Sequence, residues 1–192
     1  MPNYSLGPTP STGIYYSAAI QGNLYHGGNQ AAVATAMTAG VPTTYTGGLV
    51  LSNPIASAVN LVVQSASAAF VVAQTNAAVI SVGACYSPIT AIAGTLTAVP
   101  VQAAVVGATT ANAKGKLYSS ASITLPAAPV VSVIVGAVNT GALTVAPDAS
   151  PLRADIQGSM VIPPGGHAVF LSSATGTASS FFGSFTWLEL PA

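Results

Sequence analysis

The most regular alternation of apolar and polar side chains lies at residues 117–125. One face of this segment carries Leu117, Ser119, Ala121, Ile123 and Leu125, and the other carries Tyr118, Ser120, Ser122 and Thr124. A repeat of two residues is the period of a β-strand, and a largely apolar face opposite a polar one is typical of a strand with one buried side. We therefore predict a strand over residues 117–125.

Short apolar runs separated by turn residues predict the other strands. They lie at residues 47–52, 59–64, 69–74, 78–82, 130–145 (a pair of strands with a turn at 139–141), 156–162, 167–172 and 181–190. Residues 30–39 fit either a helix, because alanines favour one, or a strand, because larger residues alternate with small ones, and we assign a strand. Residues 163–166 (PPGG) predict a tight turn. About ten short strands without a long helix predict an all-β fold, an antiparallel β-sandwich, with a jelly roll preferred to an immunoglobulin-like topology.

Residues 1–13 (MPNYSLGPTPSTG) contain three prolines and two glycines and show no periodic pattern. Such a segment is typical of an extended arm rather than of a core element. A chain of 192 residues is long enough for one well-cored domain. We therefore predict an N-terminal arm and lead-in strand over residues 1–28, followed by a single β-sandwich domain over residues 29–192.

Aromatic side chains gather near both ends of the chain. Four of the seven tyrosines lie in the first 25 residues, namely Tyr4, Tyr15, Tyr16 and Tyr25. Because tyrosine rings are rigid and amphipathic, these four are candidate contacts with a neighbouring subunit, and packing against the chain's own body is the alternative. Phe185 and Trp187 belong to the last predicted strand, and we expect both in the structural core.

Charged residues are scarce: three are basic, three are acidic, the formal net charge is zero, and only 3% of the chain is charged. An ordinary soluble domain is about 25% charged. Three cations are too few to cover a phosphate backbone, so we expect no nucleic-acid partner. Since 51% of the residues are apolar, disorder is not expected either. A weakly charged surface lets copies of one protein crowd together without repulsion, which is typical of a component of a dense array.

The most apolar window, residues 128–147, is about long enough to span a bilayer as a helix. Pro129, Gly136 and the turn signal at 139–141 instead favour two strands. The N-terminus shows no basic region followed by an apolar stretch, so we expect neither a signal peptide nor a membrane partner. The single cysteine, Cys85, excludes a disulfide within the chain and is expected to be a buried, inert thiol.

The sequence contains no nucleophile elbow, phosphate-binding loop, HExxH or CxxC motif. A triad of a serine, His167 and either Asp148 or Asp155 is arithmetically possible, but we expect His167 to face solvent or to end a strand. A metal site built on His26 and His167 would lack further ligands. We therefore expect no catalytic, cofactor-binding or metal-binding residue. Arg153 and Asp155, two positions apart on a predicted strand, are expected to form a weak exposed pair.

Two parts of the chain are similar to segments of a known class of proteins. They are residues 46–54 (TGGLVLSNP) with 60–63 (NLVV) following, and residues 162–166 (IPPGG) through 182–187 (FGSFTW) to Pro191. In their order of turns and strands these segments resemble virion proteins of tailed bacteriophages, especially the small jelly-roll proteins that decorate heads. The likeness covers about residues 20–192. It implies that homotrimers bind the outer lattice of the major capsid protein and brace it, that the protein is made in the host cytoplasm, and that it carries no catalytic residue.

We expect a capsid decoration, or cement, protein that acts by adhesion on the outer surface of the virion. The alternative is a receptor- or glycan-binding β-sandwich module of a phage tail or head fibre. A depolymerase-like hydrolase ranks last, because the chain has few acidic residues. The number of copies in each virion separates the first two hypotheses, since a cement protein is present in many copies and a tail-tip protein in few.

Overall fold

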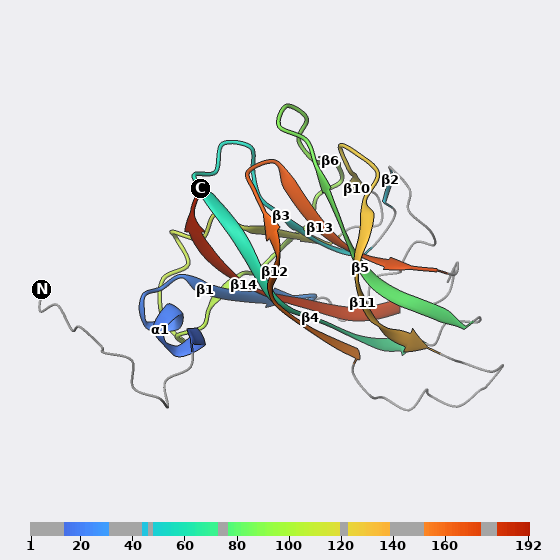
Figure 1. The fold of residues 1–192 in the computed structure, drawn as a ribbon, viewed down its shortest axis with the longest axis horizontal. Helices are drawn as coiled ribbons and strands as arrows, with labels where there is room; N and C mark the ends of the chain where they lie inside the picture. The colour runs from blue at the N-terminus through green and yellow to red at the C-terminus, as the bar shows by residue number, and fades with distance from the viewer. Residues whose placement is uncertain are drawn as a thin grey trace, which may run out of the picture.

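The chain folds as a β-sandwich of two large antiparallel sheets with a small third sheet (Figure 1). The computed structural model describes residues 14–30, 44–45, 48–72, 77–119, 123–138, 152–173 and 180–192. Its elements are α1 (Ile14–Ile20), β1 (Leu24–Gly28), β2 (Thr44–Tyr45), β3 (Leu49–Ser52), β4 (Val59–Val72), β5 (Ala78–Tyr86), β6 (Ala93–Gly94), β7 (Ala98–Val99), β8 (Gln102–Ala103), β9 (Lys116–Ser119), β10 (Ile123–Thr124), β11 (Val130–Val138), β12 (Leu152–Ile162), β13 (Gly166–Ser172) and β14 (Ser180–Pro191). The all-β antiparallel sandwich is therefore confirmed, whereas the jelly-roll topology stays a prediction.

The strands form three sheets. Sheet A has five strands in the order β12-β4-β14-β1-β8, and sheet B has six in the order β11-β5-β13-β3-β9-β7. Sheet C has three short strands in the order β2-β10-β6. In sheet A, β1 and β14 lie side by side although they come from opposite ends of the described chain, as the blue and red arrows in Figure 1 show.

Aromatic side chains fill the space between sheets A and B. The largest fully buried residues are Trp187, Phe170, Phe181 and Phe185. The ring centroids of Phe170 and Phe185 lie 4.9 Å apart. Their neighbours are small: Ala66 of β4 stands opposite Phe185, and a Cβ atom added at Gly183 would lie 2.8 Å from the Phe181 ring. Small residues beside large rings let an alanine-rich chain pack its interior at high density.

Two strands of sheet B, β3 and β13, are buried on both faces. Every residue of β13 is buried. Phe170 belongs to the main core, whereas Val169 and Leu171 belong to a second cluster that includes Ile123 of sheet C. A strand covered on both sides has a near-continuous apolar sequence. The run at 167–172 fits this pattern except for His167 and Ser172.

The single strand expected at 117–125 is two strands in different sheets. Lys116–Ser119 forms β9 in sheet B, and Ile123–Thr124 forms β10 in sheet C. Leu117 belongs to the main core, while Ile123 and Leu125 belong to the second cluster. The period of two persists because both segments bury residues of the same parity. The alternation shows which residues are buried. It does not show which sheet covers them.

The break expected between residues 64 and 69 is absent, because β4 runs without interruption over Val59–Val72. Ser65 and Ser67 are partly exposed while Ala66 is buried. Polar and apolar side chains therefore alternate through this segment, as a strand with one buried face requires. Ser65 and Ser67 therefore lie on the outer face of one long strand, and Ala66 between them lies in the core.

The N-terminal region contains a strand, β1, within the expected lead-in segment, and a helix before it. Ile14–Ile20 forms the short helix α1, which the sequence did not predict, and β1 lies within sheet A between β14 and β8. The five residues of β1 are thus part of the sandwich rather than of the arm. The predictions made for residues 1–13, 31–39 and 139–145 fall outside the described residues.

Candidate functional site

Tyr25 lies in the core. Its side chain is only 3% exposed, and its ring stacks on Trp187 with the centroids 6.2 Å apart. Alternation along β1 turns Tyr25 and Gly27 inward and His26 outward. Burial raises the pKa of the Tyr25 hydroxyl, and the nearby Glu189 carboxylate raises it further. Tyr25 is therefore a core residue of its own chain, which corrects its place among the candidate contacts.

A buried carboxylate, that of Glu189, lies near the C-terminal end of β14. Phe185 and Trp187 are both fully buried there. The Trp187 indole N–H donates to Glu189 Oε1 over 3.2 Å, and the backbone N–H of Gly115 donates to the same oxygen over 2.8 Å. The backbone N–H of Lys114 donates to Glu189 Oε2 over 2.9 Å. These bonds fix the segment before β9 to sheet A, so Glu189 has a structural role.

Tyr15 and Tyr16 are exposed on α1. Their side chains are 43% and 52% exposed, and that of Ile20 on the same helix is 55% exposed. The helix ends at Ile20 and is followed by Gly22, whose φ of 75° is the left-handed conformation that glycine adopts readily. The N–H of Asn23 donates to the carbonyl of Ala18 and closes this C-terminal cap. We call Tyr15, Tyr16 and Ile20 the α1 surface; Tyr4 lies outside the described residues.

His167 is buried, contrary to the expectation that it would face solvent. Its side chain is 2% exposed, and its cross-strand neighbours are Cys85 on β5 and Ser52 on β3. Neither ring nitrogen has a hydrogen-bond partner among the described residues. Burial lowers the pKa of the imidazole from 6.5 to about 4, so the ring is neutral at pH 7. The sequence prediction failed because the covering segments come from distant parts of the chain.

Cys85 shares this apolar environment. Burial raises the pKa of its thiol to about 11, so the thiolate, which is the nucleophilic form, is scarce at neutral pH. The version of the triad with Asp155 is not assembled, because Asp155 is exposed on sheet A whereas His167 is buried in sheet B; Asp148 lies outside the described residues. Across the described ranges, no three His, Cys, Asp or Glu side chains gather into a possible metal site.

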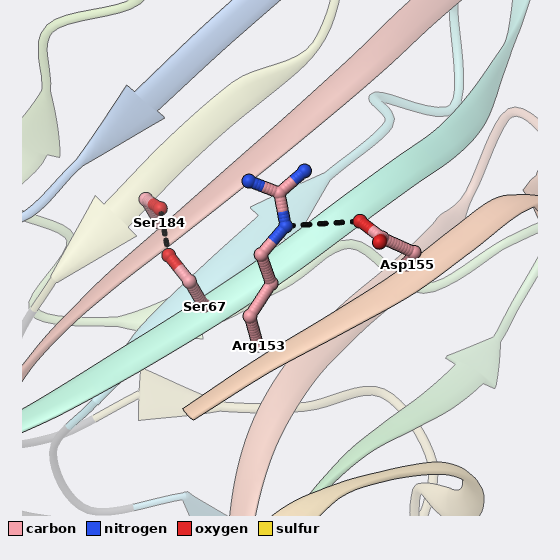
Figure 2. A network of polar contacts seen from close by, with 4 residues as sticks. All are labelled: Ser67, Arg153, Asp155 and Ser184. Atoms are coloured by element: carbon pink, nitrogen blue, oxygen red, sulfur yellow. Dashed lines mark hydrogen bonds and ion pairs between the residues drawn. The ribbon is translucent and has the colours of Figure 1, made fainter. Parts of the chain in front are cut away.

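Part of the outer face of sheet A is polar. It carries Ser65, Ser67, Ser184, Thr186, His26, Gln102, Arg153 and Asp155, all exposed or partly exposed. Figure 2 shows two contacts on this face: the hydroxyls of Ser67 and Ser184 hydrogen-bond over 2.7 Å, and Arg153 Nε donates to Asp155 Oδ1 over 2.9 Å. The sequence indicated the Arg153–Asp155 pair from its spacing. It gave no sign of the serine pair, whose members are 117 positions apart.

We compared the chain with protein-family models, curated proteins and solved structures. In the part of the chain that the structure describes, no helix is long and apolar enough to cross a membrane. None of the family models, curated proteins or solved structures gives a significant match to the chain.

Proposed function

We propose that the chain is a structural virion protein that binds the outside of a tailed-phage capsid and stabilises its lattice by adhesion. Three features support this role: the resemblance to head decoration proteins, the near absence of charge, and the β-sandwich fold. The observation that carries the proposal is the α1 surface, because it exposes two tyrosines and an isoleucine directly after the arm.

The α1 surface is suited to adhesion by its composition. Tyrosine is enriched at protein interfaces, while charged residues are depleted at their centres. Burying two half-exposed tyrosine rings would contribute on the order of 5 kcal/mol, at about 25 cal/mol/Å², before the entropy cost of association. α1 is followed at once by β1 of sheet A, so the exposed rings are attached to the rigid sandwich.

The ionisable groups of the described residues also support adhesion rather than catalysis. The Glu189 carboxylate accepts hydrogen bonds from backbone N–H groups. Burial keeps the His167 imidazole neutral and the Cys85 thiol protonated at pH 7. Arg153 and Asp155 bond to each other at the surface. None of these groups combines the access and the neighbouring acid or base that a reaction would need.

The direct test is binding to capsids that lack the protein. We expect the wild-type chain to co-sediment with such capsids, and the double variant Tyr15→Ser/Tyr16→Ser to bind at least about tenfold more weakly. Tyr86→Ser is the matched control, because Tyr86 is 53% exposed but lies on β5, away from α1. Equal binding of the double variant and the control would remove α1 from the contact. Quantitative mass spectrometry of purified particles should also find the protein in many copies.

The second candidate is a receptor- or glycan-binding module of a fibre. The observation in its favour is the polar outer face of sheet A, where hydroxyl, imidazole and amide groups stand in adjacent strands. Such groups form hydrogen bonds with sugar hydroxyls. A glycan array separates the two candidates: selective glycan binding that is lost in the Ser67→Val/Ser184→Val variant, together with a low copy number, would favour the fibre.

A further inference from the structure

The outer edge of β12 has no strand partner in the part of the chain that the structure describes. β12 is the end strand of sheet A, and among the described residues only β4 pairs with it. On its other side, the N–H and C=O groups of alternate residues therefore have no strand partner. The end strand of sheet B, β11, lies on the same side of the sandwich, because a Cβ atom added at Gly136 would lie 2.8 Å from the Leu152 side chain.

The residues of this edge would match those of a second copy of the chain if the two edges paired in antiparallel fashion with Ala154 at the centre. Arg153 and Asp155 are exposed, whereas Ala154 and Ile156 are buried on the inner face. A twofold axis through Ala154 would place Arg153 of one copy opposite Asp155 of a second copy, and Asp155 opposite Arg153. On the inner face the same axis would place Leu152 opposite Ile156. Opposite charges and apolar pairs at facing positions both stabilise neighbouring strands.

Charged residues on an edge strand usually prevent pairing with another chain. Here the two signs are arranged so that unlike charges meet, which offsets that effect. Two of the six charged residues of the whole chain stand at these positions. The existing contact between Arg153 and Asp155 within one chain is solvent-exposed, with 66% and 57% of the side chains accessible. Both groups therefore remain open to a partner.

The backbone of β12 also limits the length of a strand pair between two copies. The regular pairing of β12 with β4 is interrupted after Asp155, and Gln157 and Gly158 have φ angles of 50° and 80°. A ladder between two copies would thus be restricted to residues 152–156. A ladder of this length alone is smaller than a standard interface, which buries about 800 Å² on each partner.

We propose that this side of the sandwich joins two copies of the chain through antiparallel pairing of β12 with β12, centred on Ala154. The backbone ladder over residues 152–156 supplies the contact. The charges of Arg153 and Asp155 set the register and the choice of partner. This contact is independent of the proposed capsid role, and its test uses the purified protein alone.

The test reverses the charges at positions 153 and 155, first one at a time and then together. Arg153→Asp gives an edge with two carboxylates, and Asp155→Arg gives an edge with two guanidinium groups. We expect each variant alone to dimerise at least about tenfold more weakly than wild type in sedimentation velocity, because like charges then meet across the axis. An equimolar mixture of the two should form a heterodimer, and the double exchange Arg153→Asp/Asp155→Arg should dimerise like wild type.

Lys116→Asp is the matched control, because it reverses an exposed charge on β9, away from this edge. It should dimerise like wild type. Hydrogen exchange should show that amides within residues 152–156 become protected as the wild-type concentration rises. A wild-type chain that stays monomeric up to about 1 mM would overturn the proposal. So would single variants that associate as the wild type does, or a mixture of them that fails to recover association.

Discussion

The indole N–H of Trp187 donates to the carboxylate of Glu189, two residues further along β14, over 3.2 Å. Both side chains face the interior, since Trp187 is fully buried and Glu189 is 6% exposed. The pair joins the main core to the backbone of Lys114 and Gly115. A buried carboxylate is stable here because each of its oxygens accepts hydrogen bonds.

Removing the carboxylate should destabilise the protein strongly. Glu189→Ala would leave the Trp187 indole and the N–H groups of Lys114 and Gly115 buried without an acceptor. We expect a loss of about 3–5 kcal/mol in the free energy of unfolding, measured by urea denaturation. Asp155→Asn, at an exposed site, should change it by less than about 0.5 kcal/mol. Similar urea midpoints for the two variants would show that the buried bonds contribute little.

Trp187 should be the most costly aromatic residue to truncate. Trp187→Ala would remove a fully buried ring, its stacking on Tyr25 and its bond to Glu189. We expect a loss of about 3–5 kcal/mol, seen as a lower melting temperature in circular dichroism. Tyr16→Ala removes a ring that is 52% exposed and serves as the control, with little change expected. A variant that melts like the wild type would mean that neighbouring side chains move to fill the cavity left by the ring.

Because of His167, the free energy of unfolding should decrease as the pH is lowered. The pKa of its imidazole is about 4 in the folded state against 6.5 in the unfolded state. The unfolded state therefore binds more protons between these values, and the free energy of unfolding decreases as pH falls from about 6.5 to about 4, by at most on the order of 3 kcal/mol. Above pH 6.5 this contribution is complete.

His167→Leu should remove this part of the pH dependence. Its neighbours Ser52 and Cys85 carry no charge near neutral pH, and the chain has only three acidic residues to add titrations of their own. Urea denaturation of both proteins at a series of pH values measures the effect. If the two curves run parallel between pH 4 and 6.5, His167 is not the responsible group.

Deleting residues 1–13 should leave the sandwich folded and weaken adhesion. The described core comes entirely from residues after this segment. An extended arm of this length reaches about 40 Å, far enough to contact an adjoining subunit, and its prolines lower the entropy lost on docking. Thermal melting and co-sedimentation with capsids lacking the protein measure the two effects. Unchanged capsid binding by the folded, truncated chain would contradict a role for the arm.

Local pattern was enough to predict most of the strands. The short runs at 156–162 and 181–190, bounded by turn residues, predicted strands that the structure contains as parts of β12 and β14. The apolar run at 167–172 predicted β13, and the PPGG turn before it is also present.

What the sequence by itself determined is the type of each strand and the polarity of its faces, because these follow from the two-residue period of the backbone. Only the tertiary structure decided that β9 and β10 belong to different sheets, that Tyr25 stacks on Trp187, and that His167 is covered. These outcomes depend on residues far apart in the chain. A local pattern records whether a side chain is buried, and the partner that buries it is chosen when the sheets pack together.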